Sequence, residues 1–297
     1  MNIIEREMML GMINILNQAS QAYQNGNPIM TDDQFNARLA DLQELEKETG
    51  VIYSNSPSIN MDIKMLSEHI EVVHNHPMFG FKKCYSPEDI IKFSNDKELV
   101  ASIKLDGMTV SLSYDNGILI RSELKGNGVS GLDITEHTKR FLNVPLKINK
   151  EGTYIVDGEA IIVDEDFAEI NKNNGFINSK NLVNDTLNSL NISVVSHRKI
   201  RFMVWDVIDG GESNSLANNL NEAASLGFDV IPYWSIVHLD PKKLKGTLDY
   251  IFDYATDDGY PIDGIVFKFD DIEYGKSLGV TNQCLKNGIV YKTENVK

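Results

Sequence analysis

Lys104-Leu105-Asp106-Gly107 is the stretch that decides how the rest of this 297-residue chain is interpreted. The apolar run Leu99-Val100-Ala101 before it predicts a strand, and Gly107 predicts a tight turn. The amine of Lys104 is therefore expected at a strand end, facing a pocket, where a neutral lysine can act as a nucleophile. On its own this four-residue pattern is more often a solvated lysine before a turn.

Three later segments give the pattern its specificity, and they follow it in a fixed order. They are Asp157-Gly158-Glu159, Asp263-Gly264-Ile265-Val266-Phe267-Lys268 and Val290-Tyr291-Lys292. In the strand predicted at 263–269, Val266 and Lys268 share one face, while Ile265 and Phe267 share the other. Lys268 is therefore expected to point into a site whose back is packed.

The charged residues of these segments fit the transfer of a nucleotide to Lys104. Neighbouring cations such as Lys268 and Lys292 depress the pKa of a lysine amine and neutralise charge on a leaving phosphate. We therefore expect four catalytic residues: Lys104, Asp106, Lys268 and Lys292.

Carboxylates in the same segments suit a hard metal ion. Asp106, Glu159 and Asp263 each lie beside a glycine, and Mg²⁺ needs only one or two carboxylates besides phosphates and water. Among them we expect Asp263 and Glu159 to be the metal ligands.

Composition narrows the classes of protein. The hydrophobic content of 42% supports a sizeable core, and the length suggests about two domains. No apolar run of about 18 residues and no signal-peptide pattern occurs, so we expect a cytoplasmic protein without membrane contact. Cys84 and Cys284 lack the spacing of a zinc site. The net charge of −15 argues against a large, self-sufficient nucleic-acid surface.

Residues 1–60 are expected to form a small helical domain. Apolar residues recur near helical spacing from Ile4 to Leu16, until Asn25-Gly26-Asn27-Pro28 breaks the run. A second helix is expected to start at Thr31-Asp32-Asp33-Gln34, which has the form of a capping box, and its apolar face runs from Phe35 to Leu45.

The second helix is expected to stop at Gly50, and Ser54-Asn55-Ser56-Pro57-Ser58 is expected to be a linker. From about residue 70 the pattern changes to short strands. Val110, Leu112 and Tyr114 alternate with serines, which predicts a half-buried strand, and Asp115-Asn116-Gly117 predicts a hairpin into 118–124.

Further elements fill the rest of the region 70–297. Strands are expected near 153–163, 201–208, 228–237, 263–269 and 288–293, and helices at 166–172, 215–226 and 241–255. Strand runs interrupted by separate helices favour an α+β sheet domain over a doubly wound parallel one.

Together these motifs resemble the covalent nucleotidyltransferase superfamily and, more closely, the NAD-dependent DNA ligases. The segment at Lys104 looks like motif I, with this lysine as the adenylated nucleophile. Asp157-Gly158-Glu159 looks like motif III, whose glutamate contacts the ribose. Asp263 to Lys268 fits motif IV, and Lys292 ends a segment similar to motif V. The resemblance implies an adenylation domain with an ATP-grasp-like, antiparallel-sheet fold over residues 70–297.

The resemblance extends to both flanks of that site. The helical domain 1–60 looks like the module that binds the nicotinamide mononucleotide half of NAD, with Tyr23, Asp32 and Phe35 at or near its contact positions. This implies NAD rather than ATP as the cofactor, together with Mg²⁺. His74 and the segment Pro77 to Phe81 correspond to the part that lines the adenine side.

Some contacts differ from the family's pattern. Ser102 replaces a glutamate that reads the adenine amino group, Lys125 replaces a loop arginine, and Lys180 and Asn188 replace two further arginines. Lysine cannot reproduce a bidentate arginine contact. The residues expected to bind the cofactor are Tyr23, Asp32, Phe35, Ser102, Lys104, Lys125, Glu159, Lys180, Lys268 and Lys292.

The resemblance implies an adenylation module that forms lysyl-AMP at Lys104, releases nicotinamide mononucleotide, and passes AMP to the 5′-phosphate of nicked DNA. The family continues beyond motif V into DNA-gripping domains, which are expected here from a partner subunit or from missing C-terminal domains. The sequence does not separate a natural subunit from a fragment. Two alternatives stay open: an ATP-dependent DNA or RNA ligase, and a non-catalytic adenylate-binding subunit.

Overall fold

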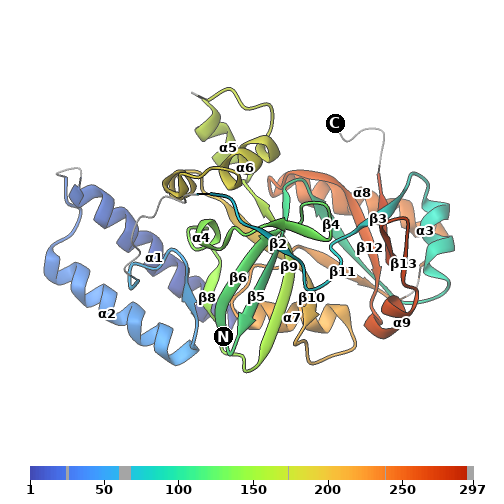
Figure 1. Cartoon of the computed structure of the whole chain (residues 1–297), viewed down its shortest axis with the longest axis horizontal. Coiled ribbons are helices and arrows are strands. Elements are labelled where there is room, and N and C mark those ends of the chain that lie inside the picture. The colour runs from blue at the N-terminus through green and yellow to red at the C-terminus, as the bar shows by residue number, and fades with distance from the viewer. Residues whose placement is uncertain (25–26, 60–67, 173, 238, 293–297) are drawn as a thin grey trace.

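Two helices open the chain in the computed structural model, which describes residues 1–24, 27–59, 68–172, 174–237 and 239–292 (Figure 1). α1 (Ile3–Gln24) and α2 (Asp32–Thr49) pack together at one end of the molecule. The predicted capping box of Thr31 and Gln34 is confirmed, and so is the stop at Gly50, which has a left-handed φ of 70°. Part of the predicted break at 25–28 lies outside the described residues.

The buried face of α1 is only partly the stripe that the sequence suggests. Met9 and Ile13 are fully buried with Leu42 of α2, whereas Ile4 and Met8 are 68% and 54% exposed. α1 carries apolar residues on several sides, so the packing partner rather than the helix itself decides which side is covered.

The segment after α2 is tied to the body of the protein. β1 (Ile52–Tyr53) pairs with β8 (Pro145–Lys147), and the Tyr53 hydroxyl donates to the Gly227 carbonyl at 2.9 Å. Ser54 is buried and donates to the carbonyl of Phe141 at 2.5 Å. The expected linker at 54–58 is therefore wrong, because its serines satisfy buried polar groups instead of facing water.

The described residues form one six-stranded antiparallel sheet in the order β1-β8-β6-β5-β9-β10. Its long strands are β5 (Met108–Asp115), β6 (Ile118–Leu124), β9 (Thr153–Ile161) and β10 (Arg201–Asp209). The predicted hairpin between β5 and β6 is confirmed. Tyr114, Tyr154 and Phe228 pack ring against ring on one face of this sheet.

β5 is buried on both faces, so the expectation of a half-buried strand is wrong. Ser111 and Ser113, on the face opposite Leu112, are 1% and 5% exposed. Glu123 and Asp157, the ladder partners of Ser111 on the two neighbouring strands, lie beside it on the same face and are buried too. The alternation of apolar and polar residues is present, but the polar face is covered by another part of the chain rather than by water.

A second sheet runs in the order β11-β4-β12-β14-β13. Its strands are β11 (Tyr233–Ile236), β4 (Leu99–Leu105), β12 (Ile262–Phe269), β14 (Cys284–Tyr291) and β13 (Val280–Thr281). These pairs are antiparallel, but β3 (Gly80–Cys84) joins β14 in parallel, which departs from a wholly antiparallel sheet. β2 (Glu71–Val73) and β7 (Ser130–Leu132) form a separate short ladder.

Helices cover the outer faces of both sheets (Figure 1). α3 (Pro87–Ser94), α8 (Pro241–Asp257) and α9 (Ile272–Ser277) pack on the second sheet. Around the first lie α4 (Thr135–Thr138), α5 (Asp164–Asn171), α6 (Ser179–Leu187), the 3₁₀ turn η1 (Ile192–His197) and α7 (Leu216–Ser225).

Comparison with the expected elements confirms the α+β class and the helices at 166–172, 215–226 and 241–255 as α5, α7 and α8. The strand expected at 228–237 shrinks to β11, and α6 was not predicted. Among the described residues, none of the helices has both the length and the apolar character needed to cross a membrane.

Candidate active site

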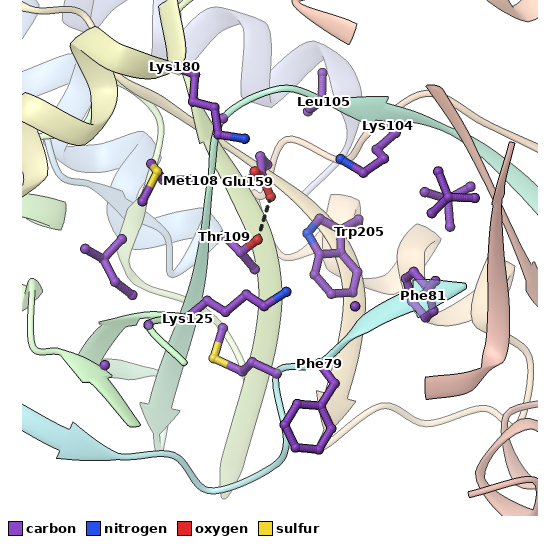
Figure 2. Close-up of a pocket in the computed structure, with 18 of the residues that line it drawn as sticks. Phe79, Phe81, Lys104, Leu105, Met108, Thr109, Lys125, Glu159, Lys180 and Trp205 are labelled. Atoms are coloured by element: carbon purple, nitrogen blue, oxygen red, sulfur yellow. Dashed lines mark hydrogen bonds between the residues drawn. The ribbon is translucent and has the colours of Figure 1, made fainter. Parts of the chain in front are cut away.

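A cavity of about 710 Å³ lies between the two sheets (Figure 2). Side chains of β3, β4, β5, β9 and β12 line it, together with the loop after β6 and one side of α6. The volume is in the range that holds a nucleotide-sized ligand.

Lys104 reaches this cavity from the end of β4. It lies opposite Gly264 in the β4–β12 ladder, on the same face as Ser102, Val266 and Lys268. A glycine is required at position 107, three residues after Lys104, because a Cβ atom there would lie 2.2 Å from the carbonyl oxygen of Ala160. The predicted strand end, tight turn and shared face are all present.

Asp263 links two of the predicted lysines. Its carboxylate is 2.8 Å from Nζ of Lys104 and 2.7 Å from Nζ of Lys292. The ladder between β12 and β4 is irregular between Ile262 and Gly264, and such a bulge re-aims the side chain of the extra residue. Burial opposes ionisation, but the charges of Lys104 and Lys292 hold the pKa of Asp263 below its ordinary value.

Lys180 and Asp106 form a second ion pair at the cavity. Nζ of Lys180 donates to the Asp106 carboxylate at 2.9 Å, from the first turn of α6. The pKa of Lys180 is raised, because this hydrogen bond and the charge of Asp106 outweigh burial. Asn184 of the same helix and Asn188, which caps its C-terminus, also line the cavity.

Glu159 lies at the centre of the cavity lysines. Figure 2 shows the amines of Lys104, Lys125 and Lys180 pointing into the space around it, and Thr109 donates to its carboxylate at 3.1 Å. Burial raises the pKa of Glu159 to about 7, although the lysines and Thr109 act in the opposite direction.

Lys125 differs from its neighbours, because within the described ranges it has no ion pair. Burial lowers its pKa, the charge of Glu159 acts against that shift, and the charge of Lys104 adds to it. A cation in this state is available to an incoming phosphate. The loop that carries it is held by Gly128, whose amide donates to the Lys125 carbonyl at 2.8 Å.

Lys268 is buried, and its ammonium group pairs with Asp206 of β10. Its Nζ lies 5.6 Å from the centre of the Trp205 ring and 5.9 Å from that of Phe81. Both rings line the cavity. Lys268 therefore lies at the cavity wall between two aromatic faces and a carboxylate from the other sheet.

Residues 71–81, here called the strap, cross the polar face of the first sheet. His76 contacts Asp157 at 2.8 Å, and His74 contacts Glu123 at 3.1 Å. The ring of His74 also hydrogen-bonds the Lys125 carbonyl at 2.9 Å. The strap carries Met78, Phe79 and Phe81 into the cavity lining, as the sequence suggests for this segment, whereas His74 is not among the lining residues.

Comparison with known proteins now identifies the family. A family model described as "NAD-dependent DNA ligase adenylation domain" matches residues 66–295. The chain belongs to this family. A curated protein named DNA ligase from Ruminiclostridium cellulolyticum is 32% identical over 96% of this chain and 44% of its own length. Another DNA ligase, from Lachnoclostridium phytofermentans, is 31% identical over 94% of this chain and 44% of its own length.

The chain thus spans less than half the length of these curated relatives. A solved structure titled "Archaeal ATP-dependent RNA ligase - form 2" has a TM-score of 0.42 at 13% identity, over 75% of this chain and 49% of that one. That likeness is too weak to add to the family assignment.

The contacts predicted for the helical pair lie outside the cavity. Tyr23, Asp32 and Phe35 do not line the cavity. Tyr23 and Asp32 are exposed on α1 and α2, and Phe35 packs against the small core between these helices. The structure thus brings Ser102, Lys104, Lys125, Glu159, Lys180 and Lys268 together around one cavity, and it leaves the helical pair apart from them.

No three His, Cys, Asp or Glu side chains converge as a preformed metal centre within the described part of the chain. Glu159 and Asp263 are hard oxygen donors, but burial raises the pKa of Glu159 to about 7, whereas the charges of Lys104 and Lys292 hold the pKa of Asp263 below its ordinary value. Two carboxylates fit Mg²⁺ only where substrate phosphates and water supply the other ligands.

Sequence reasoning missed several residues of the site. Thr109, which fixes Glu159, is on β5 at the same face as the motif III glutamate. Trp205 and Asp206 lie within β10, where no glycine neighbours them to mark a site. α6 had a usable signal, since Asn178 caps it and Leu182, Val183, Thr186 and Leu187 are buried at helical spacing.

We expect the His76–Asp157 pair to make folding stability depend on pH. Burial lowers the pKa of His76, but the hydrogen bond and charge of Asp157, with the charges of Asp206 and Glu123, raise it above 6.5 overall. The stability from the charged pair is therefore present below about pH 6.5 and is lost as the pH rises through the raised pKa. His76→Asn should lower the free energy of unfolding by about 1–3 kcal/mol near pH 6 and by less near pH 9.

Urea unfolding at the two pH values measures this difference. His69→Asn is the matched control, because His69 is exposed. A deficit of equal size at both pH values would contradict the charged pair.

Proposed function

We propose that this chain is the adenylation module of an NAD-dependent DNA ligase. The neutral amine of Lys104 attacks the adenylyl phosphorus of NAD, a phosphorus–nitrogen bond forms, and the bond to nicotinamide mononucleotide breaks. The product is lysyl-AMP, and the amine proton passes to solvent or to a neighbouring base. The observation that carries this proposal is the position of Lys104 in a nucleotide-sized cavity, beside Glu159, Lys125 and Lys180.

Asp263 prepares the nucleophile in this reaction. It holds Lys104 at 2.8 Å and is the carboxylate in direct contact with the amine that must lose a proton. Because Lys292 shares the same carboxylate, a cation also lies close to the phosphate that Lys104 attacks. Asp263 therefore orients the amine and provides a first acceptor for its proton.

The rest of the cavity is suited to the adenosine half of the cofactor. Trp205 and Phe81 supply aromatic walls, Ser102 lies on the β4 face behind them, and Glu159 is placed to accept hydrogen bonds from a ribose. Lys125, which has no ion pair within the described ranges, is placed to receive a phosphate oxygen. Asp106 keeps Lys180 in place at the opposite rim.

Mg²⁺ would be held by Asp263 and Glu159 together with phosphate oxygens, and there it would neutralise charge on the departing phosphate. The protein's own contribution is to keep these two carboxylates beside Lys104.

The helical pair 1–60 is proposed as the domain that binds nicotinamide mononucleotide, and 70–297 as the adenylation domain. Since Tyr23, Asp32 and Phe35 lie outside the cavity lining, the helical pair must move toward the cavity to contact the cofactor. The bonds that such a motion would break include Arg6 with Asp229 and the terminal amine with the Ser225 carbonyl at 2.9 Å.

AMP would then pass from Lys104 to the 5′-phosphate of a DNA nick in the cytoplasm, during repair or replication. The curated relatives named DNA ligase are more than twice as long as the region they share with this chain. We propose that DNA is gripped largely by protein outside residues 1–297, either further domains or a partner subunit, which agrees with the net charge of −15.

The test is covalent labelling with cofactor that carries a labelled adenylate. Incubation of the chain with NAD and Mg²⁺ is expected to give a protein–AMP adduct on Lys104, whereas ATP gives little. Labelling from ATP alone would instead support the ATP-dependent alternative, and tight binding without a covalent product would support a non-catalytic adenylate-binding subunit.

A double variant, Tyr23→Ala with Asp32→Ala, separates the two cofactors. Both side chains are exposed, so the fold should be unaffected, while labelling from NAD should fall by roughly tenfold or more through lost cofactor contacts. Gln21→Ala with Asp33→Ala is the matched control, since these residues are exposed on the same helices. Equal labelling of both double variants would contradict the role of the helical pair.

A further inference from the structure

Lys268 depends on a residue that none of the sequence motifs contains. Its strand, β12, belongs to the second sheet, while its partner Asp206 lies on β10, the edge strand of the first sheet. The side chains of Lys268 and Asp206 are only 8% and 15% exposed. The pair therefore joins the two sheets behind the cavity wall, where water screens the charges weakly.

A bulge in β10 directs Asp206 toward Lys268. The β9–β10 ladder is irregular between Val204 and Asp206, so Trp205 is the extra residue of the strand. Such a bulge changes the direction of the side chains that follow it. Trp205 lines the cavity and Asp206 meets Lys268, so one backbone irregularity sets both the aromatic wall and the counter-charge.

Asp206 also belongs to a larger charge-balanced cluster. It lies opposite Asp157 of β9 in the ladder, which places two carboxylates side by side. Each has a nitrogen partner: Lys268 pairs with Asp206, and the ring of His76 in the strap contacts Asp157 at 2.8 Å. The pKa of His76 is raised in part by the charge of Asp206, which agrees with this cluster.

We propose that Asp206 is a positioning residue that fixes the ammonium group of Lys268 at the cavity wall during adenylyl transfer. This inference rests on the proposed function, because it assigns Lys268 to the reacting phosphate. Without the carboxylate, the ammonium group keeps only the faces of Trp205 and Phe81, which do not determine its direction as a hydrogen bond does. Asp206 does not line the cavity, so its effect must pass through Lys268.

Asp206→Asn tests the proposal, since it keeps the shape and removes the charge. We expect the maximal rate of Lys104 adenylylation to fall on the order of 100-fold, as for a displaced catalytic group, while the NAD concentration for half-maximal rate changes by less than about threefold. Asp206→Glu should recover part of the rate. In the background of Lys268→Gln, the Asp206→Asn change should cause little further loss, because both changes remove the same contact.

A second measurement does not depend on catalysis. Limited acetylation followed by mass spectrometry reports how accessible and reactive each lysine is in the free protein. Lys268 should be protected in the wild-type chain and become roughly tenfold more reactive in Asp206→Asn, because its ammonium group loses its partner. Lys125, which has no ion pair within the described ranges, provides the internal control and should react equally in both proteins.

The labelling rate and the acetylation pattern distinguish a failure of the proposed function from a failure of the positioning role. If the wild-type chain forms no lysyl-AMP, the proposed function fails, and acetylation still decides whether Asp206 holds Lys268. If Lys268 reacts equally in both proteins, or if the rate losses of the two single variants simply add, the positioning role is overturned.

Discussion

Replacing Lys104 with alanine is expected to abolish covalent labelling by NAD, with a loss of roughly 10³-fold or more. The reason is that the amine is the only atom of this side chain that can form the phosphorus–nitrogen bond, so its removal closes the covalent route. The fold should survive, since Asp263 keeps its contact with Lys292 at 2.7 Å. Labelled cofactor followed by gel separation measures the covalent adduct, and a thermal melt measures whether the fold survives.

Two further variants make this result specific. Lys104→Arg keeps the positive charge beside Asp263 but should also fail to form the adduct, because a guanidinium group stays protonated. Lys83→Ala is the matched control, since Lys83 lines the same cavity and has no proposed role. An adduct that persists in Lys104→Ala, with AMP mapped to Lys125 or Lys180, would assign the nucleophile to another lysine.

Replacing Asp263 with asparagine is expected to lower the rate of Lys104 adenylylation on the order of 100-fold. One carboxylate contacts both Lys104 and Lys292, so its charge holds the proposed nucleophile and a second cation at once. The free energy of unfolding should fall by about 1 kcal/mol, because two partly buried ammonium groups lose their shared partner.

Single-turnover labelling measures the rate, and acetylation in metal-free buffer separates orientation from metal binding. Lys104 should become more reactive toward the acetylating reagent in Asp263→Asn, although the enzymatic rate falls, because its amine loses the carboxylate that it contacts at 2.8 Å. Asp249→Asn provides a control at an exposed acid. Wild-type labelling by Asp263→Asn would remove Asp263 from the mechanism.

Local sequence signals predicted the parts of the fold that depend on near neighbours. The capping box at Thr31 and the hairpin after Asp115 are each determined by a few adjacent residues, and both are present. The alternation in β12 correctly placed Val266 and Lys268 on the cavity face, because successive side chains of a strand point to opposite sides.

The expectations that were wrong concern residues whose environment depends on packing against distant parts of the chain. Ser111 is buried because the strap, more than 30 residues earlier in the chain, covers a face that the local pattern assigns to water. Ser54 looks like part of a linker by composition, yet β1 joins it to the edge of the first sheet. In both cases the partner is far away in sequence, so a local pattern carries no signal for it.

The sequence by itself predicted one nucleotidyl-transfer site that contains Lys104, Glu159, Asp263, Lys268 and Lys292, because residue type and order along the chain are enough for that prediction. Only the tertiary structure decided how their charges are shared: Asp263 bridges two lysines, Asp106 engages Lys180, and Asp206 holds Lys268. The physical reason is that bulges in β10 and β12, together with the approach of two separate sheets, set these contacts. Neither a bulge nor an inter-sheet distance is encoded by the spacing of residues along the chain.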